Sequence, residues 1–238
     1  MSYAKFQPNS GHPRTVGSFG SAVDLCATDA PATRQCCDIA EIRLDIVMGK
    51  AGGVDATQWA HLTEIPLLFT ARRIEEGGSQ ALSARQRMDL LGVSLDQAAL
   101  VDIEVASIGE MGGLLKELDA RQIPWIASFH DFKKLPDPQI LKEAAQRAKD
   151  AGAAIFKAAA MLSDPADLAR LAEFQLTDHG ISVATMGMGP LAPVSRLLCA
   201  QCGSSLNYGY IGKTPTAPGQ WDSLLLKQAI SRLVSIQH

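Results

Sequence analysis

Short apolar runs alternate with longer amphipathic segments along most of the chain. Eight runs rich in β-branched and aromatic residues predict strands at residues 15–19, 38–47, 65–70, 100–105, 124–129, 153–160, 180–187 and 204–209. Segments with apolar positions three and four residues apart predict helices at residues 82–92, 112–120, 138–152, 164–176 and 221–236. This alternation is typical of an α/β protein with a parallel sheet.

The number of strands decides between two α/β architectures. Eight strand–helix units in 238 residues favour a closed (β/α)₈ TIM barrel, one domain over residues 1–238, over an open doubly wound sheet. No G-x-G-x-x-G and no P-loop pattern follows a strand, which removes the main support for a nucleotide cofactor. Residues 1–13 are polar and contain Pro8, Gly11 and Pro13, so we expect a flexible N-terminal segment there.

Charge and cysteine content narrow the class of protein further. Lysine and arginine number 22 against 25 acids, without runs of like charge, so neither a nucleic-acid surface nor a membrane anchor is expected. The chain begins with no long apolar segment, and an odd number of cysteines, 5, fits a reducing compartment, which together predict a cytoplasmic protein. Cys199 and Cys202 form a single C-x-x-C without a second pair. We expect them to be small buried side chains and not metal ligands.

Ionisable residues interrupt two of the expected strands. Glu41, Arg43 and Asp45 alternate along residues 38–47, so we expect their side chains to share one face and to point into the barrel mouth. An internal ion-pair network that only stabilises the fold is the alternative. Asp102 and Glu104 repeat the pattern in residues 100–105, and for them both interpretations remain open.

Lys157 is a lone ammonium in an otherwise apolar strand. Burial there is expected to lower its pKa, and a partly neutral lysine is a nucleophile toward a carbonyl carbon. The resulting imine, once protonated, withdraws electrons from the neighbouring carbon. The alternative is a lysine paired with a barrel carboxylate.

Other polar residues are expected at the same end of the barrel. His130 ends the fifth expected strand and titrates near neutrality, so it can accept and return a proton. Arg196 and Gln220 are expected on the loops after the seventh and eighth strands, where a guanidinium suits a carboxylate ligand. Residues 209–219, rich in glycine and proline, are expected to form a loop that folds over a ligand.

Seven segments, in order, resemble the motifs of the type I 3-dehydroquinate dehydratases. They are EIRLD, FTARRIEEGG, VDIEV, SFHDF, IFKAAA, MGPLAPVSR and TAPGQ, and they cover nearly the whole chain. The resemblance implies a lyase of the shikimate pathway, a homodimer, that dehydrates the small molecule 3-dehydroquinate to 3-dehydroshikimate without metal or organic cofactor. It implies that Lys157 forms an imine, that His130 is the general base and acid, and that Glu76 orients His130.

The same resemblance implies a set of substrate-binding residues. Arg196 would bind the substrate carboxylate, and the other polar groups would surround the ring: Glu41, Arg43, Arg72, Thr216, Gln220 and Ser18. Ile42 replaces the family tryptophan, Thr216 the family serine and Ala192 the family glycine. If position 192 needs a positive φ or a close backbone approach, Arg196 would be displaced.

Two other functions share some of these features. A class I aldolase would also use a buried lysine, but no glycine-rich phosphate loop follows the seventh or eighth strand. A non-catalytic ligand-binding or regulatory descendant would keep the barrel, although this chain retains both Lys157 and His130. The sequence does not separate a biosynthetic role from quinate breakdown, because the ring chemistry is the same.

Overall fold

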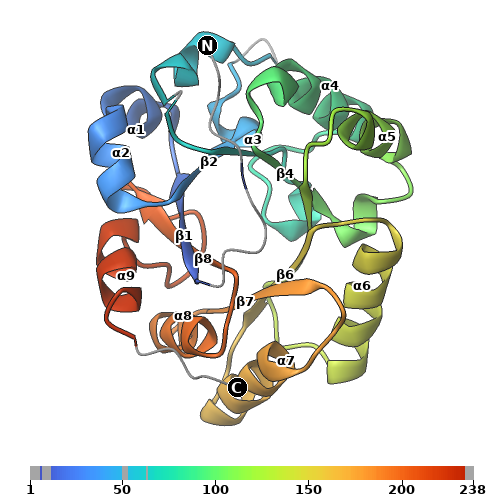
Figure 1. The fold of residues 1–238 in the computed structure, drawn as a ribbon, viewed down its shortest axis with the longest axis vertical. Coiled ribbons are helices and arrows are strands. Elements are labelled where there is room, and N and C mark those ends of the chain that lie inside the picture. The colour runs from blue at the N-terminus through green and yellow to red at the C-terminus, as the bar shows by residue number, and fades with distance from the viewer. Residues whose placement is uncertain (1–5, 7–11, 50–52, 63, 234–238) are drawn as a thin grey trace.

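The structure is a computed structural model that describes residue 6 and residues 12–49, 53–62 and 64–233. Eight parallel strands form a barrel, and each begins within two residues of the position expected from the sequence (Figure 1). The strands are β1 (Arg14–Phe19), β2 (Ile39–Arg43), β3 (Leu67–Thr70), β4 (Leu100–Glu104), β5 (Trp125–Asp131), β6 (Ile155–Met161), β7 (Ser182–Met188) and β8 (Leu206–Ile211).

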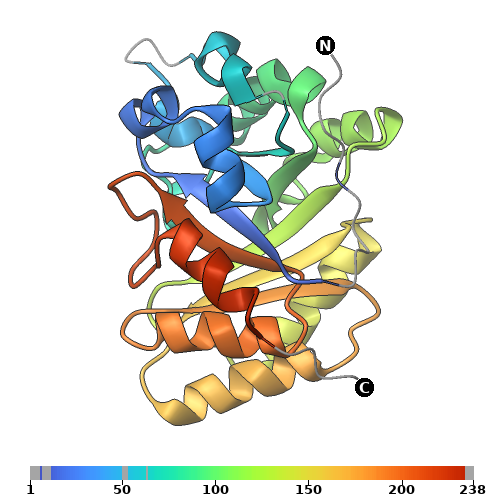
Figure 2. The ribbon, with the colours of Figure 1, turned by 60° about the vertical axis from the view of Figure 1, so that its left-hand side comes forward.

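Helices surround the barrel, as Figures 1 and 2 show. The α-helices are α1 (Ala22–Ala27), α2 (Ala30–Cys36), α3 (Leu44–Val47), α4 (Ala84–Ser94), α5 (Gly112–Ala120), α6 (Pro138–Asp150), α7 (Pro165–Leu176), α8 (Ala192–Gln201) and α9 (Ser223–Ile230). Short 3₁₀ helices cover Ala56–Leu62, Ile74–Glu76, Leu95–Gln97 and Val105–Ser107. The five helices expected from the amphipathic pattern are therefore present as α4, α5, α6, α7 and α9.

Local sequence explains where several of these helices begin. The Asp137 side chain accepts a hydrogen bond from the backbone N–H of Gln139, and Pro138 occupies the first turn of α6. The Asp164 side chain caps α7 in the same way, ahead of Pro165. An aspartate cap followed by proline satisfies free N–H groups and sets the first φ angle of a helix.

The strands follow one another round the barrel in sequence order, with a seam between β7 and β8. Neighbouring strands pair in the order β7-β6-β5-β4-β3-β2-β1-β8. In the described part of the chain no ladder joins β7 to β8, but the Ser205 N–H donates to the Val183 carbonyl at 3.0 Å. The register sets Lys157 beside Ser128 and Ser128 beside Glu104, so polar groups of three strands lie at one level.

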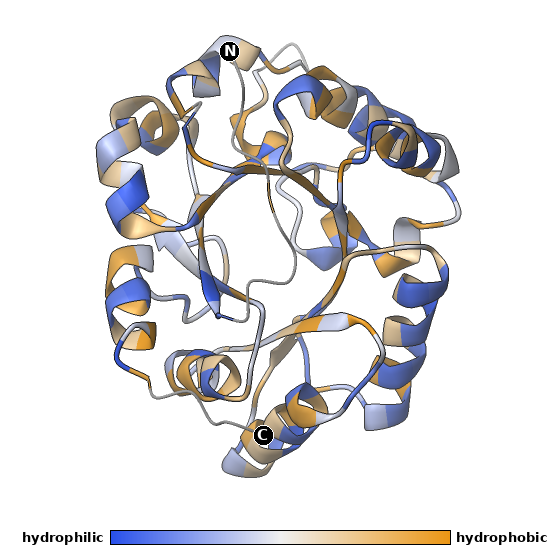
Figure 3. Cartoon of the chain, viewed as in Figure 1, coloured by the Kyte–Doolittle hydropathy of each residue, from blue (hydrophilic) through white to orange (hydrophobic). Residues whose placement is uncertain are grey.

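Side chains alternate between the barrel interior and the layer between strands and helices. Figure 3 shows the hydrophobic colouring concentrated on the strands and on the inner faces of the helices. At the amino end of the barrel the interior is apolar and fully buried, filled by Val16, Ile39, Leu68, Leu100, Ile126, Ile155 and Leu206. Polar interior side chains therefore occupy only the upper part of the barrel, near the carboxyl ends of the strands.

Two expectations about chain segments change with the structure. The second strand ends at Arg43 instead of continuing to residue 47, because residues 44–47 form α3. The flexible segment expected at residues 1–13 lies mostly outside the described residues. Phe6, which is described, is buried with the amino-end cluster, and the Arg14 guanidinium lies 4.6 Å from the centre of its ring.

Candidate active site

A pocket opens at the carboxyl ends of the strands. In a (β/α)₈ barrel this end carries the functional groups, because the loops that follow the strands converge there. Ten of the residues predicted from the sequence line the pocket: Ser18, Glu41, Arg43, Arg72, Glu76, His130, Lys157, Arg196, Thr216 and Gln220. The fold thus gathers residues from both ends of the chain into one site.

Lys157 lies on the inner face of β6 and is 4% exposed. Its Nζ lies 3.1 Å from Oδ2 of Asp102 and 4.0 Å from the centre of the Tyr208 ring. Burial lowers the pKa of the Lys157 ammonium, and the positive charge of Arg72 adds to the effect, whereas Asp102 opposes it. Lys157 is therefore paired with a barrel carboxylate, and its pKa is nevertheless below the ordinary value. Its action as a nucleophile stays a prediction.

Asp102 connects Lys157 to a neighbouring arginine. Burial opposes the charge of Asp102, but Arg72 and Lys157 outweigh it and hold the pKa of the carboxyl below its ordinary value. Its Oδ1 accepts from Nη1 of Arg72 at 2.9 Å and from Oγ of Ser128 at 2.6 Å. Asp102 is therefore an ionised carboxylate whose partners are two cations and one hydroxyl.

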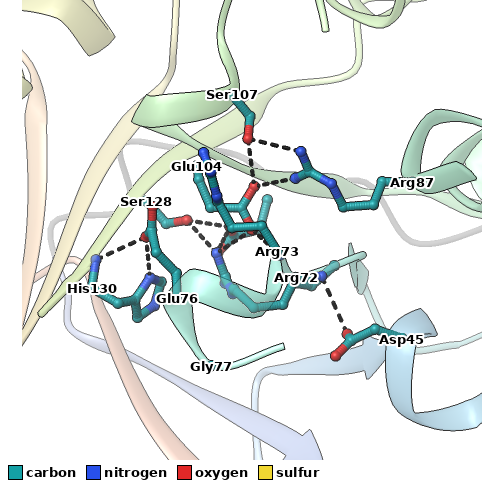
Figure 4. A network of polar contacts seen from close by, with 12 residues as sticks. Asp45, Arg72, Arg73, Glu76, Gly77, Arg87, Glu104, Ser107, Ser128 and His130 are labelled. Atoms are coloured by element: carbon teal, nitrogen blue, oxygen red, sulfur yellow. Dashed lines mark hydrogen bonds and ion pairs between the residues drawn. The ribbon is translucent and has the colours of Figure 1, made fainter. Parts of the chain in front are cut away.

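A buried ion-pair network continues outward from Arg72 (Figure 4). Nη1 of Arg72 lies 3.2 Å from Glu104, and Glu104 accepts from Nη1 of Arg87 at 2.7 Å. Arg87 also donates to Ser107 at 3.0 Å and pairs with the partly exposed Glu110. Glu104 does not line the pocket but lies behind Arg72, which does, and joins Arg72 to Arg87.

His130 and Glu76 form a pair at the edge of the pocket (Figure 4). Oε2 of Glu76 accepts the backbone N–H of His130 at 2.9 Å and lies 3.0 Å from its Nδ1. Since that oxygen already acts as an acceptor, we assign the Nδ1 proton to His130, which leaves Nε2 to accept a proton. Burial lowers the pKa of His130 well below 6.5, with further lowering from Arg72 and Lys157. Burial likewise raises the pKa of Glu76 to about 7.

Glu41 and Arg43 lie on the inner face of β2, as the alternation predicts. Glu41 accepts hydrogen bonds from Oγ1 of Thr70 at 2.8 Å and from the hydroxyl of Ser18. Arg43 Nη2 donates to the Gly77 carbonyl at 3.1 Å. These contacts fix one carboxylate and one guanidinium at the pocket wall.

The prediction that Asp45 shares this face is wrong. Asp45 begins the first turn of α3, does not line the pocket and is fully buried. Its carboxylate accepts from Nε and Nη2 of Arg43 at 2.9 and 2.8 Å, and from the backbone N–H groups of Arg72 and Ser79. Asp45 therefore holds Arg43 in place from behind.

Arg196 lies in α8, not on the loop after the seventh strand where the sequence predicts it. Its Nε donates to the Tyr208 carbonyl at 3.0 Å, and its Nη1 donates to the Gly187 carbonyl at 2.9 Å. Arg196 thus bridges β7 and β8 at the seam where no ladder forms in the described chain. No carboxylate of the described residues pairs with it, and burial lowers its pKa to about 10.

The loop after β8 closes over this side of the pocket. Oε1 of Gln220 accepts from the N–H and the hydroxyl of Thr216 at 2.8 and 2.9 Å. Gly189 N–H donates to the Pro218 carbonyl at 3.1 Å, which joins the loop to the end of β7. Thr216, Ala217 and Gln220 line the pocket, in agreement with a loop that covers a ligand.

Ala192 is compatible with this arrangement. Among the described non-glycine residues only Gln122 has a positive φ, so position 192 requires no left-handed conformation. The close approach belongs instead to Gly219, whose φ is +70° and where an added Cβ would lie 2.2 Å from the Gly189 carbonyl oxygen and 2.9 Å from the Ala192 methyl. Glycine is thus needed at 219 and not at 192.

Several pocket residues escaped the sequence analysis. Tyr208, Met186 and Met188 lie on the inner faces of β8 and β7, and Phe132 and Ala217 come from the loops after β5 and β8. A two-residue alternation running through β7 and β8 would have placed the first three inside the barrel. The apolar side chains supply a wall against which a carbon ring can pack.

Three other features are absent from the described residues: a metal site, a disulfide and a membrane-spanning helix. No three histidine, cysteine, aspartate or glutamate side chains among them are arranged to hold a metal ion. All five cysteines are free thiols. Cys199 is buried in α8 as expected, whereas Cys202 is only partly buried, so the expectation of a buried side chain is wrong for Cys202. No described helix is long and apolar enough to cross a membrane.

Fold and site together define a (β/α)₈-barrel protein with a lysine-centred pocket. A model of the type I 3-dehydroquinase family matches residues 19–235, and the chain belongs to that family. The 3-dehydroquinate dehydratase of Shouchella clausii is 32% identical over 87% of this chain and 83% of its own length. That of Haloarcula marismortui is 31% identical over 91% and 98%. The structure of 3-dehydroquinate dehydratase from Enterococcus faecalis superposes with a TM-score of 0.81 and 25% identity, over 97% and 98% of the two chains.

Proposed function

We propose that this protein dehydrates 3-dehydroquinate to 3-dehydroshikimate through an imine on Lys157. The observation that carries the proposal is Lys157 itself, a buried amine of lowered pKa in the same pocket as His130. A neutral amine adds to a ketone carbon, whereas an ammonium does not. Family membership and the names of the relatives support the choice of substrate.

The proposed reaction has four steps: formation of the imine, removal of a proton, loss of the hydroxyl and hydrolysis of the imine. Nζ of Lys157 adds to the ring ketone. The carbonyl oxygen leaves as water with one proton from the amine and one taken up from solvent, which gives a protonated imine; the final hydrolysis returns the solvent proton. Nε2 of His130 removes a proton from the adjacent carbon, and the electron pair moves toward the imine nitrogen as an enamine. The enamine expels the hydroxyl from the next carbon, which leaves as water with the proton that His130 returns. Water then hydrolyses the imine and frees both the product and Lys157.

Glu76 acts on this cycle by holding His130. Its Oε2 contacts both Nδ1 and the backbone N–H of His130, which fixes the ring orientation and directs Nε2 toward the pocket. A carboxylate in this position also stabilises the imidazolium that forms when His130 takes the proton.

The remaining polar groups bind the ring substituents. Arg196 is a buried guanidinium without an anionic partner among the described residues, so a substrate carboxylate would complete its surroundings. Thr216 and Gln220 cover that side, while Ser18, Glu41, Arg43 and Arg72 offer donors and acceptors to the ring hydroxyls. No metal or organic cofactor enters any step.

The proposal extends to the setting of the enzyme. We place the reaction in the shikimate pathway, with the protein acting as a cytoplasmic homodimer, on the strength of the family resemblance. Sedimentation equilibrium tests the dimer, since a monomer across the working concentration range would contradict it.

Trapping of the imine tests the proposed function. The protein is incubated with 3-dehydroquinate and borohydride, and intact mass followed by peptide mapping is expected to show one reduced adduct per chain, on Lys157. Lys142, which is exposed on α6, provides the control: Lys142→Ala should trap fully, and Lys157→Ala should not trap at all. A folded wild-type protein that turns over no 3-dehydroquinate and forms no adduct would rule the proposal out.

A further inference from the structure

Tyr208 is the aromatic side chain that contacts the amine of Lys157. It lies on the inner face of β8 and is 4% exposed. Nζ of Lys157 lies 4.0 Å from the centre of its ring, inside the range of a cation–π contact. The contact joins two strands, β6 and β8, that are not neighbours in the barrel.

The charged and titratable groups around Lys157 come from every side of the upper barrel. Asp102 of β4 accepts from Nζ directly at 3.1 Å, and Glu41 of β2 also favours the ammonium, whereas Arg72 opposes it. His130 of β5 lies close enough for Lys157 to lower its pKa. Nζ thus has an ionic contact with Asp102 and an uncharged contact with the Tyr208 ring.

An aromatic face suits the nitrogen at two stages of the proposed reaction. The ammonium has three N–H donors, but a protonated imine keeps only one, so the imine nitrogen can donate to a single acceptor. The attraction between a cation and a ring face has no such requirement for donors, because it arises from the ring quadrupole. A ring that contacts Nζ can therefore stabilise the positive charge both before and after the imine forms.

We propose that Tyr208 is a further catalytic residue, whose ring face stabilises the positive charge on Nζ of Lys157 as ammonium and then as protonated imine. The second half of this inference rests on the proposed function, while the first half requires only the described geometry. Stabilising the positive charge keeps the imine in its protonated form, which accepts the electron pair of the neighbouring C–H bond far more readily than a neutral imine does.

The hydroxyl of Tyr208 is not needed for this role. Its oxygen is buried, and no group among the described residues hydrogen-bonds with it. Burial raises the pKa of the phenol, and the negative charges of Glu41 and Asp102 raise it further, so the side chain stays neutral. The ring and the hydroxyl can thus be tested separately.

A series of ring variants tests the inference. Tyr208→Phe removes the hydroxyl and keeps the ring, and replacement by mono-, di- and pentafluorophenylalanine then weakens the quadrupole at nearly constant shape. The first readout is the pH midpoint at which Lys157 is reductively methylated by formaldehyde and borohydride, measured by peptide mapping without any 3-dehydroquinate. Since the ring favours the ammonium, the midpoint is expected to fall progressively, by about 0.4 to 1.5 pH units between phenylalanine and pentafluorophenylalanine.

The second readout is turnover of 3-dehydroquinate by the same proteins. Weaker stabilisation of the protonated imine is expected to lower kcat by roughly 2- to 30-fold across the series. Pentafluorophenylalanine at Phe156 is the matched control, because that ring faces the helix layer and packs on Phe174 at 6.2 Å; neither readout should change there. Circular dichroism confirms that each protein is folded, and Tyr208→Leu provides a ring-free variant if fluorination disturbs packing.

The outcomes separate the inference from the proposed function. A constant methylation midpoint across the folded series, with the Tyr208→Leu midpoint also unchanged, would overturn the role of the ring. If the midpoint falls but the wild-type protein does not turn over 3-dehydroquinate, the role of the ring toward the ammonium is supported. The role toward the imine is then overturned together with the proposed function. A falling midpoint with constant kcat would likewise limit Tyr208 to the ammonium and overturn its part in turnover.

Discussion

Oε2 of Glu76 contacts His130 twice, 2.9 Å from the backbone nitrogen and 3.0 Å from Nδ1. One carboxylate oxygen thus fixes both the position of the main chain and the rotation of the imidazole. Burial shifts the pKa of each partner toward its neutral form, downward for His130 and upward to about 7 for Glu76. At neutral pH His130 is therefore an uncharged base.

Removal of the imidazole is expected to stop the reaction after the imine. In His130→Ala, Lys157 still adds to the ketone, but no base takes the neighbouring proton, so kcat should fall about 10²- to 10⁴-fold. Intact-mass measurement during turnover should show the adduct accumulating without borohydride. His179→Ala is the control, since His179 stacks on Phe174 outside the pocket. Wild-type turnover in His130→Ala would exclude it as the base.

The raised pKa of Glu76 implies a stability cost at alkaline pH. Its pKa rises from 4.5 in the unfolded chain to about 7 in the folded protein, so the associated stability is complete below pH 4.5 and is lost as pH rises through 7. Glu76→Gln removes this titration. The difference in free energy of unfolding, Glu76→Gln minus wild type, is expected to increase by about 1–3 kcal/mol between pH 4.5 and pH 8, because only the wild type loses stability over this range. Urea unfolding at the two pH values measures the difference, and a constant difference would contradict the shift.

Asp102 is expected to be the most sensitive carboxylate of the barrel. Asp102→Asn leaves Arg72 and Lys157 buried without the charge that both contact, which should cost about 3–5 kcal/mol of stability. The same change should lower the pKa of Lys157 further and shift its methylation midpoint to lower pH. Asp89→Asn, which breaks the exposed pair with Arg85, should change stability by no more than about 0.5 kcal/mol. Equal effects of the two substitutions would show that burial of the network is unimportant.

The apolar runs predicted the strands well because barrel strands are buried on both faces and are nearly continuously apolar. The pattern failed where distant contacts decide the local structure. Residues 44–47 continue the alternation of β2, but the Asp45 carboxylate accepts the N–H of Ser79, 34 residues away, and the chain turns into α3. Nothing local to the sequence specifies that bond.

The site could be predicted as a set of residues but not as a set of contacts. Ten of the polar residues that the motifs place at one end of the barrel line the pocket, whereas Asp45 of the same motifs does not. Tyr208 was overlooked because an aromatic residue in a strand is ordinarily a core residue. Its contact with Lys157 depends on how β6 and β8 face each other across the barrel, which spacing along the chain does not specify.

The bridge that Arg196 makes between β7 and β8 leads to the last prediction. Its Nε and Nη1 reach the Tyr208 and Gly187 carbonyls, at 3.0 and 2.9 Å, and a single ammonium cannot reproduce this fork. Arg196→Lys should lower stability by about 1–3 kcal/mol, because a buried carbonyl loses its donor. It should also raise the KM for 3-dehydroquinate more than it lowers kcat, since the proposed role of Arg196 is to bind a carboxylate that does not react. Thermal unfolding measures the effect on stability, and steady-state kinetics measures the effect on KM and kcat. A wild-type KM in the Arg196→Lys variant would mean that Arg196 joins β7 to β8 and does not bind substrate.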